Sequence, residues 1–295
     1  MSSFYQQLFF VLLLLAQGSL LFSAGSTPAD QLARATNAYN RTDYQGALDA
    51  VVSLPVKPLK ANLLIGKSYY MLGDFKKACD FLHKGAEQDS NNSEYYLWLG
   101  RAYGRRAESG NPLTAPTYAG KARQNFEKAV QLDPKNGDAL NDLFDYYLQA
   151  PGFLGGGLDK ATTLLPKIKD YDSAEFHFAL AQIAEKRKEF GTAEQQFRRA
   201  ADLAPRQVGR ILDLAKFMFR QGRVREADSL LKQAAIISPS DPKVLFEQAS
   251  VLVRSKRDLN EAKRLLKIYM QSPLTPDLPS RADAEKLLRQ AESGA

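Results

Sequence analysis

Three groups of residues have side chains and spacings that could do chemistry. The first is the glycine-rich stretch Gly152 to Gly157, which Lys160 follows closely. Backbone N–H groups of such a stretch can cradle a phosphate. A Walker-type phosphate loop, however, follows a strand and has Lys directly after its last glycine. Here Leu158 and Asp159 intervene and the preceding segment has a helical pattern, so a flexible connection between two helices is the favoured interpretation.

The other two groups are one cysteine–histidine pair and one pair of carboxylates. Cys79, the only cysteine, and His83 are four residues apart and share one face of a helix. Zinc sites use at least three protein ligands, and the second histidine, His177, is distant in the sequence. Asp142 and Asp145 are explained by a solvated helix face. The sequence therefore predicts no catalytic residue, no metal site and no cofactor.

The composition is that of a folded chain with a modest positive charge. Of the 295 residues, 44% are hydrophobic and 25% are charged, which excludes intrinsic disorder. The formal net charge of +7 favours anionic partners through long-range attraction. It does not favour nucleic acid, because no recognised nucleic-acid-binding motif accompanies it.

The N-terminal segment has the composition of an export signal. The first 29 residues contain no Asp, Glu, Lys or Arg, and residues 8–16 form an unbroken apolar run. The small residues around Gly25 predict removal of residues 1–25 as a signal peptide, although the usual basic residues are missing before the run. The alternative is an uncleaved anchor over residues 8–25, which approaches the roughly 20 residues that span a bilayer. The chain is thus expected to be exported, as a periplasmic or secreted protein or as a membrane-anchored one.

Residues 26–295 are organised as a helical repeat, which is clearest between residues 190 and 239. A small apolar residue recurs where two backbones approach, a larger one follows, and a proline ends the second helix. A period of 34 residues with this pattern is typical of stacked helical hairpins. The matched positions are Phe190, Ala193, Phe197, Ala200 and Pro205, which correspond to Val224, Ala227, Leu231, Ala234 and Pro239.

The pattern resembles the tetratricopeptide repeat family over about residues 30–272. The same period of 34 residues appears in the first helices of two other repeats, where Gly66 and Tyr69 correspond to Gly100 and Tyr103. The resemblance implies an all-α fold, a right-handed α-solenoid of about seven helix-turn-helix repeats with a C-terminal capping helix. Two departures from the pattern predict loop insertions near 106–118 and 150–158.

The resemblance also assigns residues to the concave groove, where the family binds its partners with the first helix of each repeat. They form a basic and aromatic lining with one acidic interruption at Asp145. Such a lining suits a protein or peptide with acidic groups and apolar anchors. For Trp98 and Phe219, packing between helices is the alternative. The assigned residues are Lys60, Lys67, Tyr70, Trp98, Arg101, Arg105, Asn141, Phe178, Gln182, Lys216, Phe219 and Arg220.

These features predict a non-catalytic protein–protein interaction scaffold in a bacterial envelope assembly, by family analogy. The alternative is an accessory subunit that binds an anionic polymer or surface through its basic faces, including the cluster from Arg254 to Lys267. An enzyme that uses the glycine-rich stretch and Lys160 is the least favoured hypothesis. Membrane contact is expected only through the N-terminal segment, if it is retained.

Overall fold

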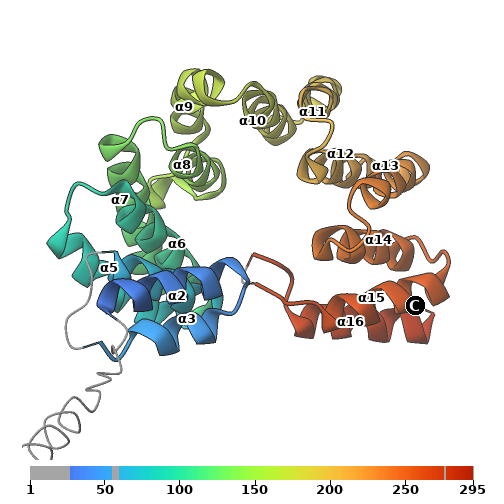
Figure 1. Ribbon diagram of the computed structural model, residues 1–295. Coiled ribbons are helices and arrows are strands. Elements are labelled where there is room, and N and C mark those ends of the chain that lie inside the picture. The colour runs from blue at the N-terminus through green and yellow to red at the C-terminus, as the bar shows by residue number, and fades with distance from the viewer. Residues whose placement is uncertain (1–26, 55–59, 276, 295) are drawn as a thin grey trace, which may run out of the picture.

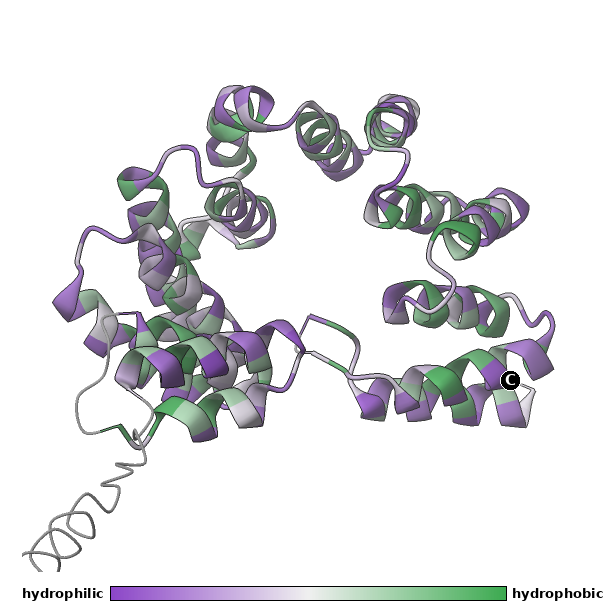
Figure 2. Cartoon of the chain, viewed as in Figure 1, coloured by the Kyte–Doolittle hydropathy of each residue, from purple (hydrophilic) through white to green (hydrophobic). Residues whose placement is uncertain are grey.

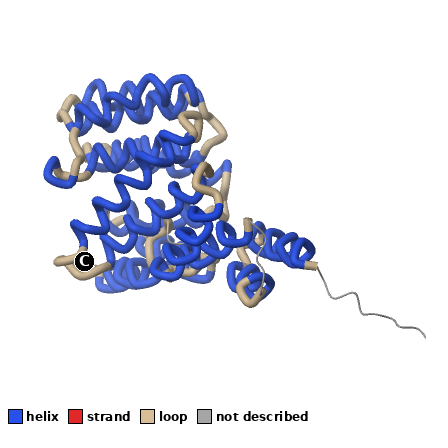
Figure 3. The backbone as a smooth tube through the Cα atoms, turned by 90° about the vertical axis from the view of Figure 1, so that its left-hand side faces the viewer, coloured by secondary structure: helices blue, strands red, loops and turns tan. Residues whose placement is uncertain are grey.

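The computed structural model describes residues 27–54, 60–275 and 277–294. The predicted export signal, residues 1–25, lies outside these ranges. The described residues form fifteen α-helices and one short 3-10 helix, with no strand among them (Figure 3). None of these helices is long and apolar enough to cross a membrane. The prediction of an all-α chain is confirmed.

The helices follow one another as seven pairs, and a last helix closes the array (Figure 1). The helices of each pair pack together, and the second helix of each pair packs against the first helix of the next, so the pairs stack into a solenoid with a capping helix, as predicted. The pairs are α2 (Pro28–Asn40) and α3 (Tyr44–Val51), α4 (Ala61–Met71) and α5 (Phe75–Gln88), α6 (Ser93–Ser109) and α7 (Ala115–Leu132), α8 (Gly137–Gln149) and α9 (Leu158–Tyr171), α10 (Ser173–Lys186) and α11 (Phe190–Leu203), α12 (Val208–Arg220) and α13 (Val224–Ile237), and α14 (Pro242–Arg254) and α15 (Leu259–Gln271), with α16 (Arg281–Ser293) as the cap.

Glycine allows the two helices of a pair to approach closely at the positions that the repeat pattern marks. A Cβ atom on Gly66 of α4 would lie 2.5 Å from the side chain of Leu82 in α5. The same holds one repeat later, where a Cβ on Gly100 of α6 would lie 2.5 Å from Phe126 of α7. Core interiors are close-packed, so neither position has room for a larger residue. Figure 2 shows that each helix carries both hydrophobic and hydrophilic residues, as stacked amphipathic helices require.

The connection between α6 and α7 differs from the prediction of an insertion near 106–118. Helix α6 continues to Ser109 and α7 begins at Ala115, so only residues 110–114 lie outside the helices. Pro116 was expected in a loop, but it lies in the first turn of α7. Proline is suited to that position because the N–H it lacks has no partner within the helix. The extra residues of this repeat therefore lengthen its two helices.

The array curves until its C-terminal part meets its N-terminal part (Figure 1). The contact is made by the loop between α15 and α16, which we call the C-terminal loop. Its Asp277 accepts a hydrogen bond of 3.4 Å from the hydroxyl group of Tyr70 in α4. The loop is held on its own repeat because Tyr269 of α15 donates to the carbonyl oxygen of Pro279 at 2.5 Å and Leu278 packs on the C-terminal core. The solenoid is thus a closed ring in which residues 207 positions apart touch.

Candidate functional site

The glycine-rich connection between α8 and α9 uses its backbone donors internally. The N–H groups of residues 155–157 donate to the carbonyl oxygens of Gly152, Pro151 and Tyr147, at 2.9, 3.3 and 2.7 Å. The ammonium group of Lys160 donates to the carbonyl oxygen of Gly155 at 2.9 Å. These donors are therefore committed to a tight turn, and the phosphate-cradle hypothesis has no geometry to support it.

The cysteine–histidine pair is part of the packing. Cys79 is buried, and burial raises the pKa of its thiol, which disfavours the reactive thiolate. His83 Nε2 lies 2.7 Å from the hydroxyl oxygen of Tyr103. Among the residues that the structure describes, no group of three or more His, Cys, Asp or Glu side chains is placed to hold a metal ion.

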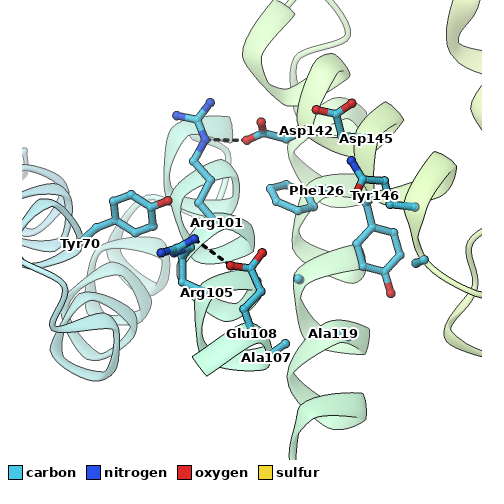
Figure 4. A pocket seen from close by; sticks show the side chains of 14 residues that line it. Tyr70, Arg101, Arg105, Ala107, Glu108, Ala119, Phe126, Asp142, Asp145 and Tyr146 are labelled. Atoms are coloured by element: carbon cyan, nitrogen blue, oxygen red, sulfur yellow. Dashed lines mark hydrogen bonds and ion pairs between the residues drawn. The ribbon is translucent and has the colours of Figure 1, made fainter. Parts of the chain in front are cut away.

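A cavity of about 430 Å³ opens between α6, α7 and α8 (Figure 4). Its floor consists of small or apolar residues of α6 and α7, which are Gly104, Ala107, Ala119, Ala122 and Phe126. Its rim carries charged side chains of α6 and α8, and two tyrosines flank it. Such a combination of an apolar floor with a few convergent polar groups is typical of a binding site.

The two arginines of the rim are held by carboxylates. Arg101 joins α6 to α8, with its Nε 2.5 Å from Asp142 Oδ2 and its Nη2 3.2 Å from Asp138 Oδ2. Its guanidinium group also lies over the ring of Trp98, at 4.8 Å from the ring centroid. Arg105 pairs with Glu108 at 2.8 Å. Both cations are thus positioned before any partner arrives, which lowers the entropic cost of binding.

Asp145 is the exception on the rim, because no cation of the described residues forms an ion pair with it. Its side chain is exposed and hydrogen-bonded to Gln182 of α10. The surrounding wall of the groove and the carboxylates of Asp142, Glu175 and Asp213 raise the pKa of Asp145 to about 7. The concave wall formed by α8, α10 and α12 therefore has an excess of negative charge around Asp145.

Comparison with known proteins agrees with this architecture. A family model described as tetratricopeptide repeat matches residues 168–208, from the end of α9 to the start of α12. Residues 168–208 thus match a tetratricopeptide repeat (TPR), and the chain has the all-α solenoid fold of TPR proteins. No curated protein sequence matches it.

Solved structures that resemble this chain share its fold at low sequence identity. A tetratricopeptide repeat protein from Parabacteroides merdae is 14% identical with a TM-score of 0.61, over 91% of this chain and 100% of that chain. Yeast Tom70 is 17% identical with a TM-score of 0.61, over 90% of this chain and 53% of that chain. A thermophilic TPR protein from Thermus thermophilus is 18% identical with a TM-score of 0.53, over 65% of this chain and 100% of that chain.

The TPR pattern assigned twelve residues to one groove, and the structure brings only some of them together. Tyr70, Arg101 and Arg105 line the cavity. Asn141 and Gln182 lie beside Asp145, one on the same helix and one as its hydrogen-bonding partner. The side-chain oxygens of Asn141 and Gln182 are buried and accept no hydrogen bond from the described residues.

Trp98 supports the packing alternative. It is 9% exposed, and its ring contacts Tyr70 edge-on at a centroid distance of 5.3 Å. Lys67 lies over the same ring, with its Nζ 4.9 Å from the centroid. Trp98 therefore fills the space between α4 and α6 and supports Lys67 and Arg101. The structure favours this packing role over direct contact of the ring with a partner.

The remaining predicted residues lie outside the cavity. Lys60 is exposed at the N-cap of α4, and Phe178 is covered by the guanidinium group of Arg210, 4.2 Å above its ring. A separate hollow of about 240 Å³ between α12 and α14 is lined by the three predicted residues of the sixth repeat, Lys216, Phe219 and Arg220. The twelve residues thus form more than one surface.

Basic residues that the sequence places in the groove are paired with carboxylates of neighbouring repeats. Arg220 pairs with Glu185 at 2.8 Å and Lys216 with Glu247 at 3.3 Å. Arg210 pairs with Glu175 of the preceding repeat. These partners are 31 to 35 residues apart, close to the repeat period of 34. Each of these bases has its acidic partner about one repeat period away in the sequence, on the first helix of an adjacent repeat. This spacing was the signal in the sequence that could have indicated the ion pairs.

Proposed function

We propose that this TPR protein is a non-catalytic scaffold that binds a segment of a partner protein on its concave face. The cavity between α6, α7 and α8 is the main contact in this proposal. The observation that carries it is the open apolar floor beneath a rim of charges that ion pairs already hold in place. An apolar floor supplies binding free energy by burying surface, and a fixed polar rim supplies specificity.

We further propose that the scaffold works after export, in an envelope assembly. The uncharged N-terminal segment supports this part, with residues 1–25 removed or residues 8–25 retained as an anchor. N-terminal sequencing of the protein isolated from its native cell tests it. A mature chain that begins near Ser26 is expected for a cleaved signal, and an intact N-terminus on a chain found in the cytosol would contradict export.

Binding of an anionic polymer through a basic groove is less well supported than protein binding. The arginines and lysines of the groove are paired with carboxylates of the chain, so few of their charges are free for a polyanion. In the last repeat Arg264 is likewise paired, with Glu261 at 2.7 Å. An enzymatic role has no support from the glycine-rich connection, whose donors are used internally.

Site-specific photo-crosslinking in the native cell tests the proposed function. A photoreactive phenylalanine analogue replaces Gln149, which is exposed and lines the cavity, or Gln124, which is exposed on α7 outside the lining. We expect a discrete crosslinked partner protein with the analogue at position 149 and none, or much less, at position 124. The same products at both positions, or none at 149, would overturn the assignment of the cavity.

A further inference from the structure

We propose that the cavity binds a large apolar side chain of a partner peptide, and that a Lys or Arg next to it in that peptide pairs with Asp145. This inference rests on the proposed function and names the chemistry of the partner. It reverses the expectation of an acidic partner that the basic residues of the sequence suggested.

Gly104 leaves the floor of the cavity open. It lies in the interior of α6, lines the cavity, and a Cβ atom built on it would meet no atom within 4 Å. Glycine inside a helix is less stable than alanine, so its presence calls for a reason. At Gly66 and Gly100 close packing against Leu82 and Phe126 explains the glycine. No such contact exists at Gly104, and the space it leaves is available to a side chain from outside.

The floor around this space has the polarity that an apolar anchor needs. Ala107, Ala119 and Ala122 present methyl groups, and Phe126 adds an aromatic ring. Burying a Leu or Phe side chain there removes its apolar surface from water and so favours binding. The volume of about 430 Å³ accommodates a single large side chain with part of its backbone.

The charges around the cavity select the residue beside the anchor. Two cations, Arg101 and Arg105, and three carboxylates, Glu108, Asp142 and Asp145, line it, which leaves one net negative charge. Both arginines already have carboxylate partners, and Asp145 has none among the described residues.

Other carboxylates strengthen this selection. Glu175 of α10 and Asp213 of α12 act on Asp145, and Asp277 of the C-terminal loop acts on Asp142. Lys and Arg side chains are cationic donors without acceptors, so they complement the negative charge around Asp145.

Selection from a phage-displayed library of random peptides tests this inference directly. The bait is the chain from residue 26 to 295, and the selected peptides are then measured against variants. Gly104→Leu adds a side chain to the cavity at a position where its Cβ would meet no atom within 4 Å. Gly120→Leu is the matched control, because Gly120 of α7 also faces open space but does not line the cavity. Asp145→Lys reverses the unpaired charge.

We expect the selected peptides to combine a Leu, Phe or Met with an adjacent Lys or Arg. Their affinity should fall at least about tenfold, equivalent to about 1.4 kcal/mol, with Gly104→Leu and with Asp145→Lys, and should be unchanged with Gly120→Leu. Selection of acidic peptides, or equal binding by the Gly104 and Gly120 variants, would overturn this inference and leave peptide binding as a function. No enrichment at all, together with no crosslink at position 149, would contradict the proposed function itself.

Discussion

The two halves of the concave face have similar charged residues but different floors. Between α6 and α8 the floor is apolar and open, and arginines border it. Between α12 and α14 a hollow of about 520 Å³ is lined by charged side chains, including Lys243 and Glu247, and by the chain's own Asp277 and Pro279. The repeat thus supplies a similar scaffold in both halves. Whether a half can take an apolar anchor depends on what lines its floor, and in the C-terminal half the C-terminal loop supplies part of a largely charged lining.

The largest expected effect separates two glycines of α6. Gly100→Leu should destabilise the chain by about 3 kcal/mol or more, because a Cβ there would lie 2.5 Å from Phe126 in a packed interface. Gly104→Leu should instead stabilise it by up to about 1 kcal/mol, because it only improves helix propensity. Chemical denaturation of both variants measures the difference. Equal losses would show that the floor at Gly104 is packed and that the cavity is closed.

The next effect concerns the paired charges of the two halves. Arg210 is mostly buried, lies over Phe178 and holds Glu175 and Asp213. Arg210→Ala should therefore cost about 2 to 3 kcal/mol in stability, since it leaves two partly buried carboxylates without a cation. Arg105→Ala at the rim of the open cavity should cost less than about 1 kcal/mol, because that pair is exposed. A loss of stability for Arg105→Ala as large as that for Arg210→Ala would contradict this difference between the two ion pairs.

A smaller effect follows from the raised pKa of Asp145. The groove wall and the carboxylates of Asp142, Glu175 and Asp213 raise it to about 7 in the folded chain, against about 3.9 when unfolded. The folded state therefore binds this proton more tightly, and its contribution to stability is lost as the pH rises from about 4 to about 7.

Asp145→Asn should remove this dependence. The variant should match the parent near pH 4 and exceed its stability above pH 7 by about 1 kcal/mol or less, because the side chain is exposed to water in the groove. Thermal unfolding midpoints of both proteins across this range provide the measurement. A stability difference that is the same at pH 4 and pH 8 would contradict the raised pKa.

The smallest expected effect tests the closure of the ring. Tyr70→Phe removes the donor to Asp277, and the loss should be about 0.5 to 1 kcal/mol. A double-mutant cycle with Asp277→Ala should show that the second substitution adds little once the first is present. Tyr171→Phe serves as a control, because Tyr171 is exposed on α9. Fully additive losses from Tyr70→Phe and Asp277→Ala would show that the two side chains do not interact.

The fold was predictable because the repeat shows in the spacing of apolar residues along the sequence. The small and large apolar residues that pack each hairpin recur every 34 residues, as at Ala193 and Ala227, so the helix pairs follow from the sequence alone. The connection near 106–118 was misjudged because Pro116 was interpreted as a loop residue, whereas proline is compatible with the first turn of a helix.

The site was less predictable, because it depends on contacts between repeats. The positions that TPR proteins use for binding predicted Tyr70, Arg101 and Arg105 in the groove. The carboxylates that neutralise the groove become visible only when the repeats are stacked in register. The hydrogen bond between Tyr70 and Asp277 joins positions 207 residues apart and depends on the curvature of the whole array. The free space beside Gly104 depends on how the side chains of α7 and α8 are placed around it.

Binding of an apolar peptide side chain in the cavity beside Gly104 is tested most directly with the chain's single tryptophan as a reporter. Trp98 contacts Tyr70 and Arg101, and both of these residues line the cavity. A tryptophan-free peptide from the selection, with an apolar residue next to a lysine, is titrated while Trp98 fluorescence is recorded. We expect a saturable change for the parent and for Gly120→Leu, and none for Gly104→Leu at the same concentrations. The same saturable change in all three proteins would contradict this expectation.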